Sequence, residues 1–231
     1  MGWDEAFYWK VQGRLVGSGQ IVPGRGQGGS VRLTIAETEP EATPEARGES
    51  KPTTKRRLKE RPLYQPIRTT LERWISRFGF DDVHIEETHS QGSKLTGGTF
   101  TRPDITAAGV RTYVFLPKPL EIITFEIKSL EAVGIMGVLE AIAHREAAHR
   151  SYVIYAISRA AFESSAEAER IFELSQKYGI GLVLTEDPSE VETWEIVLDA
   201  VRHEPDPARL DRFLGDLPSD VMKKQLHRWK T

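Results

Sequence analysis

Two short and almost continuous apolar runs constrain the fold of this chain most strongly. They read SYVIYAIS at residues 151–158 and IGLVLTED at 180–187, and a helical pattern that ends at Gly179 separates them. Strands of this composition are buried on both faces, and strands that alternate with helices belong to α/β folds. The sequence therefore predicts a central β-sheet flanked by helices.

The region before these runs favours antiparallel pairing. A helical pattern covers residues 63–80 and ends at Gly79. Three stretches follow with strand character: DVHIEETH, then RPDITAAG with VRTYVFL as a hairpin, then EIITFEIKS. Antiparallel strands followed by alternating helix and strand predict a mixed sheet, which we expect to be completed by a long helix over 130–150 and by helices near the C-terminus.

The N-terminal part of the chain has a different organisation. Residues 1–35 show one amphipathic helical face followed by IVPGRGQGGSVRLT, which predicts a β-hairpin with Arg25 at its tip. Residues 36–62 are first acidic, then basic, and poor in large apolar side chains, so we expect a flexible linker. The predicted domains are thus 1–35, the linker 36–62 and a main domain over 63–231.

A possible catalytic site lies on the strand EIITFEIKS. Side chains alternate along a strand, so Glu126 and Lys128 share one face while Phe125 and Ile127 share the other. Asp104 opens the neighbouring strand, and a hairpin can return it to the side of Glu126. Two carboxylates beside a lysine suit a hard divalent ion such as Mg²⁺.

The pattern Pro103-Asp104 followed by Glu126-Ile127-Lys128 resembles the PD-(D/E)xK nuclease superfamily, which has the restriction-endonuclease-like fold. The order helix, strand, strand with Asp, strand with Glu-x-Lys, helix, strand is followed here from about 63 to 157. The resemblance implies that Asp104, Glu126 and the backbone carbonyl of Ile127 hold Mg²⁺, for which Mn²⁺ can substitute. It also implies that Lys128 orients or activates the attacking water, and we expect burial to lower its pKa.

Other polar residues have weaker support. Members of this superfamily often carry an acid on the first core helix, and Glu72 is the candidate here. Glu140 and Arg145 on the predicted helix after the lysine strand are further candidates, although a solvated position is the favoured interpretation of both. His144 and His149 have the wrong spacing for a shared zinc, and we interpret them as surface or phosphate-facing residues.

The N-terminal segment LVGSGQIVPGRGQGGSVRLT resembles the recognition helix and wing of a winged helix-turn-helix domain, of which it would supply only a part. In such domains the helix enters the major groove and the wing contacts the backbone or minor groove. The resemblance implies the following DNA contacts: Lys10, Gln12, Arg14, Arg25 and Arg32. A small helix–hairpin that binds protein instead is the other interpretation of this segment.

Composition limits the remaining possibilities. The chain has 231 residues, no cysteine and a net charge of −3, so thiol catalysis is excluded and any DNA contact must come from local basic patches. No long apolar run or signal peptide is evident, and we expect a cytoplasmic protein without a membrane partner. The favoured hypothesis is a Mg²⁺-dependent DNA endonuclease of the restriction type, acting as a homodimer. The other is a non-catalytic DNA-binding regulator on the same scaffold.

Overall fold

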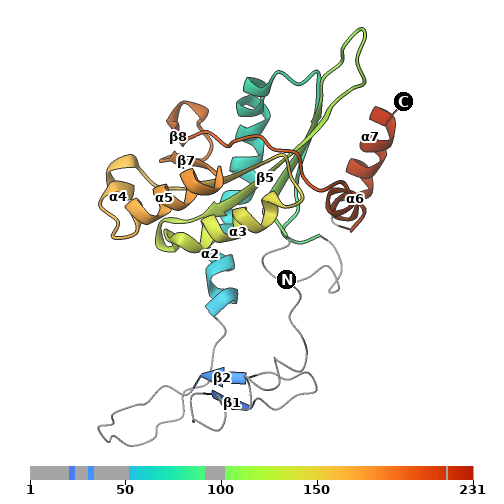
Figure 1. The fold of residues 1–231 in the computed structure, drawn as a ribbon. Helices are drawn as coiled ribbons and strands as arrows, with labels where there is room; N and C mark the ends of the chain where they lie inside the picture. Colours follow the sequence, from blue (N-terminus) through green and yellow to red (C-terminus); the bar gives the residue numbers. More distant parts are fainter. Residues whose placement is uncertain (1–20, 24–30, 34–51, 92–101, 217, 231) are drawn as a thin grey trace, which may run out of the picture. The chain divides into compact units, whose positions relative to one another are not determined.

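The computed structural model describes residues 21–23, 31–33, 52–91, 102–216 and 218–230 of the chain (Figure 1). The chain divides into two compact units, Met1–Glu49 and Ser50–Thr231. In the first unit, β1 (Ile21–Pro23) and β2 (Val31–Leu33) pair antiparallel, with Ile21 opposite Leu33. This pairing confirms the predicted hairpin, while the expected preceding helix and Arg25 lie outside the described residues.

The second unit is built on a six-stranded sheet whose strands follow the order of the chain. From β3 to β5 the pairing is antiparallel, β5–β6 and β6–β7 are parallel, and β7–β8 is again antiparallel. The strands are β3 (Asp82–Glu87), β4 (Ile105–Val110), β5 (Leu120–Lys128), β6 (Arg150–Tyr155), β7 (Gly181–Thr185) and β8 (Trp194–Leu198). The predicted mixed sheet is therefore confirmed.

Helices flank this sheet on both faces. The α-helices are α2 (Pro52–Trp74), α3 (Ile135–Arg145), α4 (Arg159–Glu163), α5 (Ala168–Tyr178), α6 (Pro207–Asp216) and α7 (Asp220–Lys230). Short 3₁₀ turns are η1 (Ile75–Phe78), η3 (Leu130–Ala132) and η4 (Val191–Thr193). The order α2-β3-β4-β5-α3-β6 is the order of elements that the sequence predicts for this region.

Helix α2 begins earlier than the sequence suggests. It extends from Pro52, so residues 52–62 are helical and the expected linker over 36–62 is wrong in this part. Pro62 and Pro66 lie inside the helix, and each lacks the N–H that an intrahelical hydrogen bond needs. The free energy gained by packing α2 against the sheet therefore has to offset the cost of the hydrogen bonds that are missing at these two prolines.

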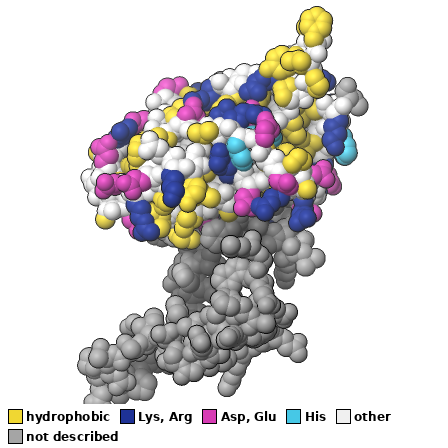
Figure 2. Space-filling model, in the orientation of Figure 1, with side chains coloured by type: hydrophobic (Ala, Val, Ile, Leu, Met, Phe, Trp, Pro, Cys, Tyr) yellow, Lys and Arg dark blue, Asp and Glu magenta, His cyan; other side chains and the backbone are white. Residues whose placement is uncertain are grey.

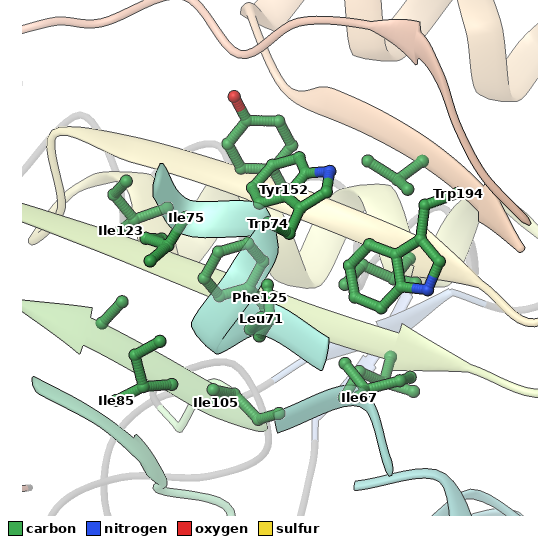
Figure 3. Packing of buried hydrophobic residues seen from close by; sticks show 14 of the residues in the cluster. Ile67, Leu71, Trp74, Ile75, Ile85, Ile105, Ile123, Phe125, Tyr152 and Trp194 are labelled. Carbon is green, nitrogen blue, oxygen red and sulfur yellow. The ribbon is translucent and has the colours of Figure 1, made fainter. Parts of the chain in front are cut away.

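The face of the sheet under α2 carries an aromatic core. Trp74 lies at its centre, with ring centroids 5.2 Å from Tyr152, 5.9 Å from Phe125 and 6.0 Å from Trp194 (Figure 3). Edge-to-face contacts at such distances add to the stabilisation from burial of the rings. This core holds α2 against the middle of β5 and β6.

The opposite face is covered by α3 and α5, and farther along by α6 and α7. Val138 and Ala141 of α3 pack with Val153 and Tyr155 of β6 in one buried cluster. A separate cluster joins α7 to the far ends of β4 and β5, through the following residues: Ala108, Val110, Ile122, Met222, Leu226 and Trp229. Both faces of β5 are thus buried, which leaves its polar side chains inside the protein.

Some predicted elements differ in extent. VRTYVFL does not form a separate strand, because β4 ends at Val110 and pairs directly with β5, so that residues 111–119 form a loop. The long helix expected over 130–150 is divided into η3 and α3, and the helical pattern before Gly179 is divided into α4 and α5. Gly79 and Gly179 end their helices with φ of 64°, a left-handed conformation that favours glycine.

Within the described ranges, none of the helices combines the length and the apolar character that crossing a bilayer requires.

We predict that Gly181→Ala destabilises the sheet. A Cβ at this position would lie 2.0 Å from the ring of Tyr152, which is fully buried and has no room to shift. Overpacking of this kind costs about 1–3 kcal/mol. Urea unfolding should show a lower midpoint concentration of urea, while the slope of the unfolding free energy against urea concentration stays unchanged.

The matched control for this substitution is Gly215→Ala on α6, where an added Cβ meets nothing within 4 Å. It should be neutral or stabilise the protein by up to about 1 kcal/mol, because alanine is the better helix former. Equal unfolding midpoints for the two variants would contradict the tight packing inferred at Gly181.

Candidate active site

Polar side chains gather at the end of the sheet where β5 finishes and β4 starts. The register pairs Ile105 with Phe125, so the preceding residue, Asp104, lies across from Glu126. Phe125 and Ile127 belong to the core under α2, and Glu126 and Lys128 point to the α3 side, as the alternation predicts. Asp104, Glu126 and Lys128 are 5–7% exposed, so this cluster is almost closed to solvent.

The ammonium group of Lys128 lies at the centre of the cluster. Its Nζ is 2.5 Å from Oε1 of Glu126, 2.7 Å from Oε2 of Glu140 on α3 and 3.7 Å from Oε1 of Glu60 on α2. Each of these side chains is less than a tenth exposed. Three elements distant in sequence are therefore joined through one buried cation.

Asp104 is oriented by a hydrogen bond rather than by direct contact with the lysine. Its Oδ2 accepts a hydrogen bond of 2.8 Å from the backbone N–H of Ile127. Tyr64 on α2 lies beside the same carboxyl group, and burial together with the charge of Asp104 raises the pKa of the Tyr64 hydroxyl. The hydrogen bond from Ile127 therefore holds the carboxyl group of Asp104 against β5.

The acids of the cluster differ in how readily they ionise. Burial raises the pKa of Asp104 to about 6, although Lys128 and the hydrogen bond from Ile127 act in the opposite direction. Burial and the adjacent charge of Asp104 hold the pKa of Glu126 well above its ordinary value. For Glu140, burial opposes ionisation, but the hydrogen bond shared with Glu126 and the charge of Lys128 outweigh it and lower the pKa. The pKa values of these two neighbouring acids are therefore shifted in opposite directions, and Glu126 ionises less readily than Glu140.

Lys128 is protonated in this environment. Burial acts to lower its pKa, but the charges of Glu126, Glu140, Glu60 and Asp104 outweigh burial and raise the pKa above its ordinary value. The expectation that burial alone would lower it is wrong for this arrangement. Lys128 can therefore donate hydrogen bonds and positive charge, whereas it holds its proton too firmly to act as a base.

The acid that α2 contributes is Glu60, and Glu72 lies elsewhere. Glu72 has a side chain that is 54% exposed and pairs with Arg68 at 3.3 Å on the outer side of the helix. The buried face of α2 is formed by Glu60, Tyr64, Ile67, Leu71 and Trp74. These positions are three or four residues apart, as expected for one face of a helix. Extending the apolar face back from Ile67 by two turns leads to Glu60, so this spacing is the sequence signal that could have identified it.

Helix α3 contributes Glu140 and, one turn later, His144. The side chain of His144 is 1% exposed, and its Nδ1 lies 3.8 Å from Oε2 of Glu126. Arg145 points away and donates to the carbonyl of Val201. His149 is also buried, and its Nδ1 accepts a hydrogen bond from the backbone N–H of Ile122. The interpretation of both histidines as surface residues is wrong, as is the solvated position favoured for Glu140.

The donor chemistry of the cluster fits a hard divalent cation. Three carboxyl groups lie within 4 Å of the Lys128 ammonium, Asp104 is close by, and burial raises the pKa of both Asp104 and Glu126. Carboxylate oxygens are the ligands that Mg²⁺ prefers. In the described part of the chain no three acid or histidine side chains are already arranged as a coordination shell, because Lys128 lies between the acids. A metal would thus have to share these oxygens with the lysine.

Of the five DNA contacts expected in the N-terminal unit, only Arg32 lies among the described residues. Lys10, Gln12, Arg14 and Arg25 lie outside the described residues, and Arg32 is placed in β2 through its backbone, opposite Val22.

Comparison with known proteins adds little to this geometry. No protein-family profile matches the chain, and no curated protein matches it. Among solved structures, the SPO1766 protein of unknown function from Silicibacter pomeroyi is similar, with 15% identity over 65% of this chain and 80% of that chain and a TM-score of 0.34. A likeness at this level carries no argument about the fold or the site.

We predict that Asp104→Asn changes how stability depends on pH. A carboxyl group whose pKa rises from 3.8 to about 6 on folding binds more protons in the folded than in the unfolded state between these values. Its stabilising contribution is present below about pH 3.8 and is lost as the pH rises through about 6. The free energy of unfolding of the wild type, minus that of the variant, should therefore fall across this window and then level off.

Urea unfolding in EDTA at a series of pH values measures this difference without interference from divalent ions. Glu72→Gln, which removes an exposed carboxyl group from the same unit, serves as the control for the substitution itself. A wild-type-minus-variant difference that increases with pH would contradict a raised pKa at Asp104.

Proposed function

We propose that this chain is a Mg²⁺-dependent endonuclease that hydrolyses phosphodiester bonds in DNA, of the PD-(D/E)xK type. The observation that carries the proposal is the convergence of Asp104, Glu126 and Lys128 in one buried cluster, on two paired strands that a helix precedes and a helix follows. Each part of this pattern alone is common on protein surfaces. Their combination with a third acid, Glu140 from α3, and a fourth, Glu60 from α2, gives a cluster of oxygen ligands and one cation that suits metal-assisted hydrolysis of a phosphodiester.

The residues that would hold the metal are Asp104, Glu126 and the carbonyl of Ile127, with Glu60 and Glu140 as neighbours. When bound, such an ion neutralises phosphate charge and acidifies a coordinated water, and Mn²⁺ can supply the same chemistry. The hydrogen bond from Ile127 orients the carboxyl group of Asp104 before any ligand arrives. A preorganised carboxylate avoids the cost of reorienting it when the reaction takes place.

Lys128 supplies the positive charge of the site. It carries its proton, so its role is to donate hydrogen bonds to a phosphate oxygen or to the attacking water rather than to remove a proton. Glu140 and Glu60 hold its ammonium close to Glu126. Because the surroundings have a low dielectric constant, this charge acts more strongly on a developing anion than it would in water.

The remaining parts of the proposal follow from the resemblance and the chemistry together. The N-terminal unit would read DNA through Lys10, Gln12, Arg14, Arg25 and Arg32, and cutting both strands would need two copies of the site. A role against foreign DNA is the biological setting that restriction-type cleavage implies.

One observation favours a second candidate, a DNA-binding regulator that retains the scaffold without catalysis. Lys128 is 6% exposed and is ion-paired on several sides, so a phosphate has to displace some of these contacts to reach it. An ion-pair cluster that only stabilises the fold would have this appearance as well. The two candidates differ in whether divalent ions activate the site.

We expect Lys128→Ala to abolish cleavage and to preserve DNA binding. Loss of one group that stabilises the transition state costs about 10²–10³-fold in rate. The assay measures nicking of supercoiled plasmid in Mg²⁺, with binding measured separately in Ca²⁺ by gel shift. Lys177→Ala, which removes an exposed lysine of α5, is the matched control and should cut at the wild-type rate. Equal cleavage by Lys128→Ala would remove this residue from the mechanism, and absence of any Mg²⁺-dependent cleavage by the wild type would favour the regulator.

We further expect Glu60→Gln to lower the affinity for Mg²⁺, so that cleavage needs more of the ion. Glu72→Gln should leave the Mg²⁺ requirement unchanged. Both residues lie on α2, but only Glu60 contacts Lys128. Removal of a group that supports metal ligands typically costs about 10–100-fold in metal affinity. A Mg²⁺ titration of the cleavage rate should shift to higher concentration for Glu60→Gln. If Glu72→Gln shifted the Mg²⁺ titration and Glu60→Gln did not, the acid that α2 contributes would be Glu72 and the assignment of Glu60 would be wrong.

A further inference from the structure

The loop between β4 and β5 exposes a run of large apolar side chains. Tyr113, Val114, Phe115 and Leu116 are 48%, 87%, 95% and 64% exposed. We call these four residues the knob. The loop projects from the body of the domain in Figure 1, and apolar side chains stand clear of the surface at the same place in Figure 2. Consecutive exposed apolar residues are unfavourable in water and mark interaction sites.

A cavity of about 750 Å³ lies beside the base of the knob. One wall is the loop itself with Val110 and Leu120, and the other is formed by α6 and α7 with Leu210, Leu214 and Trp229. A volume of this size lies within the range of binding pockets, about 300–1,000 Å³. Basic side chains such as Lys118 and Lys223 also line it, as is usual where an apolar centre has a polar rim.

We propose that the cavity receives the knob of a second copy of this chain, so that two copies exchange knobs around a two-fold axis. Knob and cavity are adjacent on one chain, and an isologous dimer requires each copy to present both halves of the contact. Residues 113–117 carry no charge, so the knob itself brings no ionised group into the apolar centre of the cavity, and the lysines of the lining lie at its rim. The knob is anchored at both ends by strands of the sheet, which limits the entropy that docking costs.

The size of the contact is sufficient for a stable dimer. An aromatic side chain buries about 150–250 Å², so the knob removes on the order of 500 Å² from water in each copy. Together with the cavity walls that they cover, two reciprocal insertions reach the order of 1,600 Å² that is typical of specific interfaces. A membrane would accept the knob but would leave the neighbouring cavity unfilled, so a second copy explains both features.

This interface is independent of the proposed nuclease function. The loop that carries the knob joins Val110 to Leu120, while Asp104 and Lys128 lie at the opposite ends of the same two strands. Knob variants therefore leave the candidate active site untouched.

Sedimentation velocity of the full chain over a range of concentrations tests the dimer. We expect a dimer for the wild type and monomers for Phe115→Ser and for Gly215→Trp. The second substitution fills the cavity from α6, where an added Cβ meets nothing within 4 Å. Val201→Ser, at an apolar residue that is 58% exposed and does not line the cavity, is the control and should remain dimeric. A wild type that is monomeric at every concentration, or a Phe115→Ser variant that dimerises equally well, would overturn the proposal.

Disulfide trapping identifies the contact itself, because the natural chain contains no cysteine. Phe115→Cys and Gly215→Cys are mixed and oxidised, and peptide mass spectrometry should find residue 115 of one copy linked to residue 215 of the other. Absence of this link in a dimeric sample would refute the knob-in-cavity arrangement. If the wild type is a monomer that binds phosphatidylserine vesicles and Phe115→Ser does not, the knob is a membrane contact and the proposal fails.

Discussion

Burial of both faces of β5 is the constraint on which the rest of this structure depends. Phe125 and Ile127 pack under α2, while Glu126 and Lys128 face α3, so this one strand contributes to the apolar core and to the polar cluster. Buried charges have to find partners, because water does not reach them. Glu140 and Glu60 supply those partners, and the positions of α2 and α3 are thereby linked to the chemistry at the end of β5.

Much of the sheet could be predicted from sequence, because its signals are local. Continuous apolar runs identify β6 and β7, alternation identifies the two faces of β5, and glycines with φ of 64° mark the ends of η1 and α5. The convergence of Asp104 with Glu126 was also predictable, since a hairpin needs only the spacing between them. The residues that could be found in this way all lie within single elements or neighbouring strands.

The remaining features depend on contacts between distant elements. The composition of residues 52–62 suggests a linker, yet tertiary packing makes them helical and buries Glu60 beside Lys128. Whether the pKa of Lys128 is raised or lowered depends on how many acids surround it, and no single sequence motif specifies that number. VRTYVFL has strand propensity, but β4 pairs with β5 in a register that leaves this segment as a loop. In each case a three-dimensional neighbour overrides the local preference.

The raised pKa values of Asp104 and Glu126 have a consequence for the history of the chain. Burial acts against the ionised form of each acid, and an amide of similar size does not carry that cost. Mutational drift would therefore remove these acids soon after selection ceased to favour them. Descendants that have lost their biological task should carry substitutions here first, while the aromatic core around Trp74 persists.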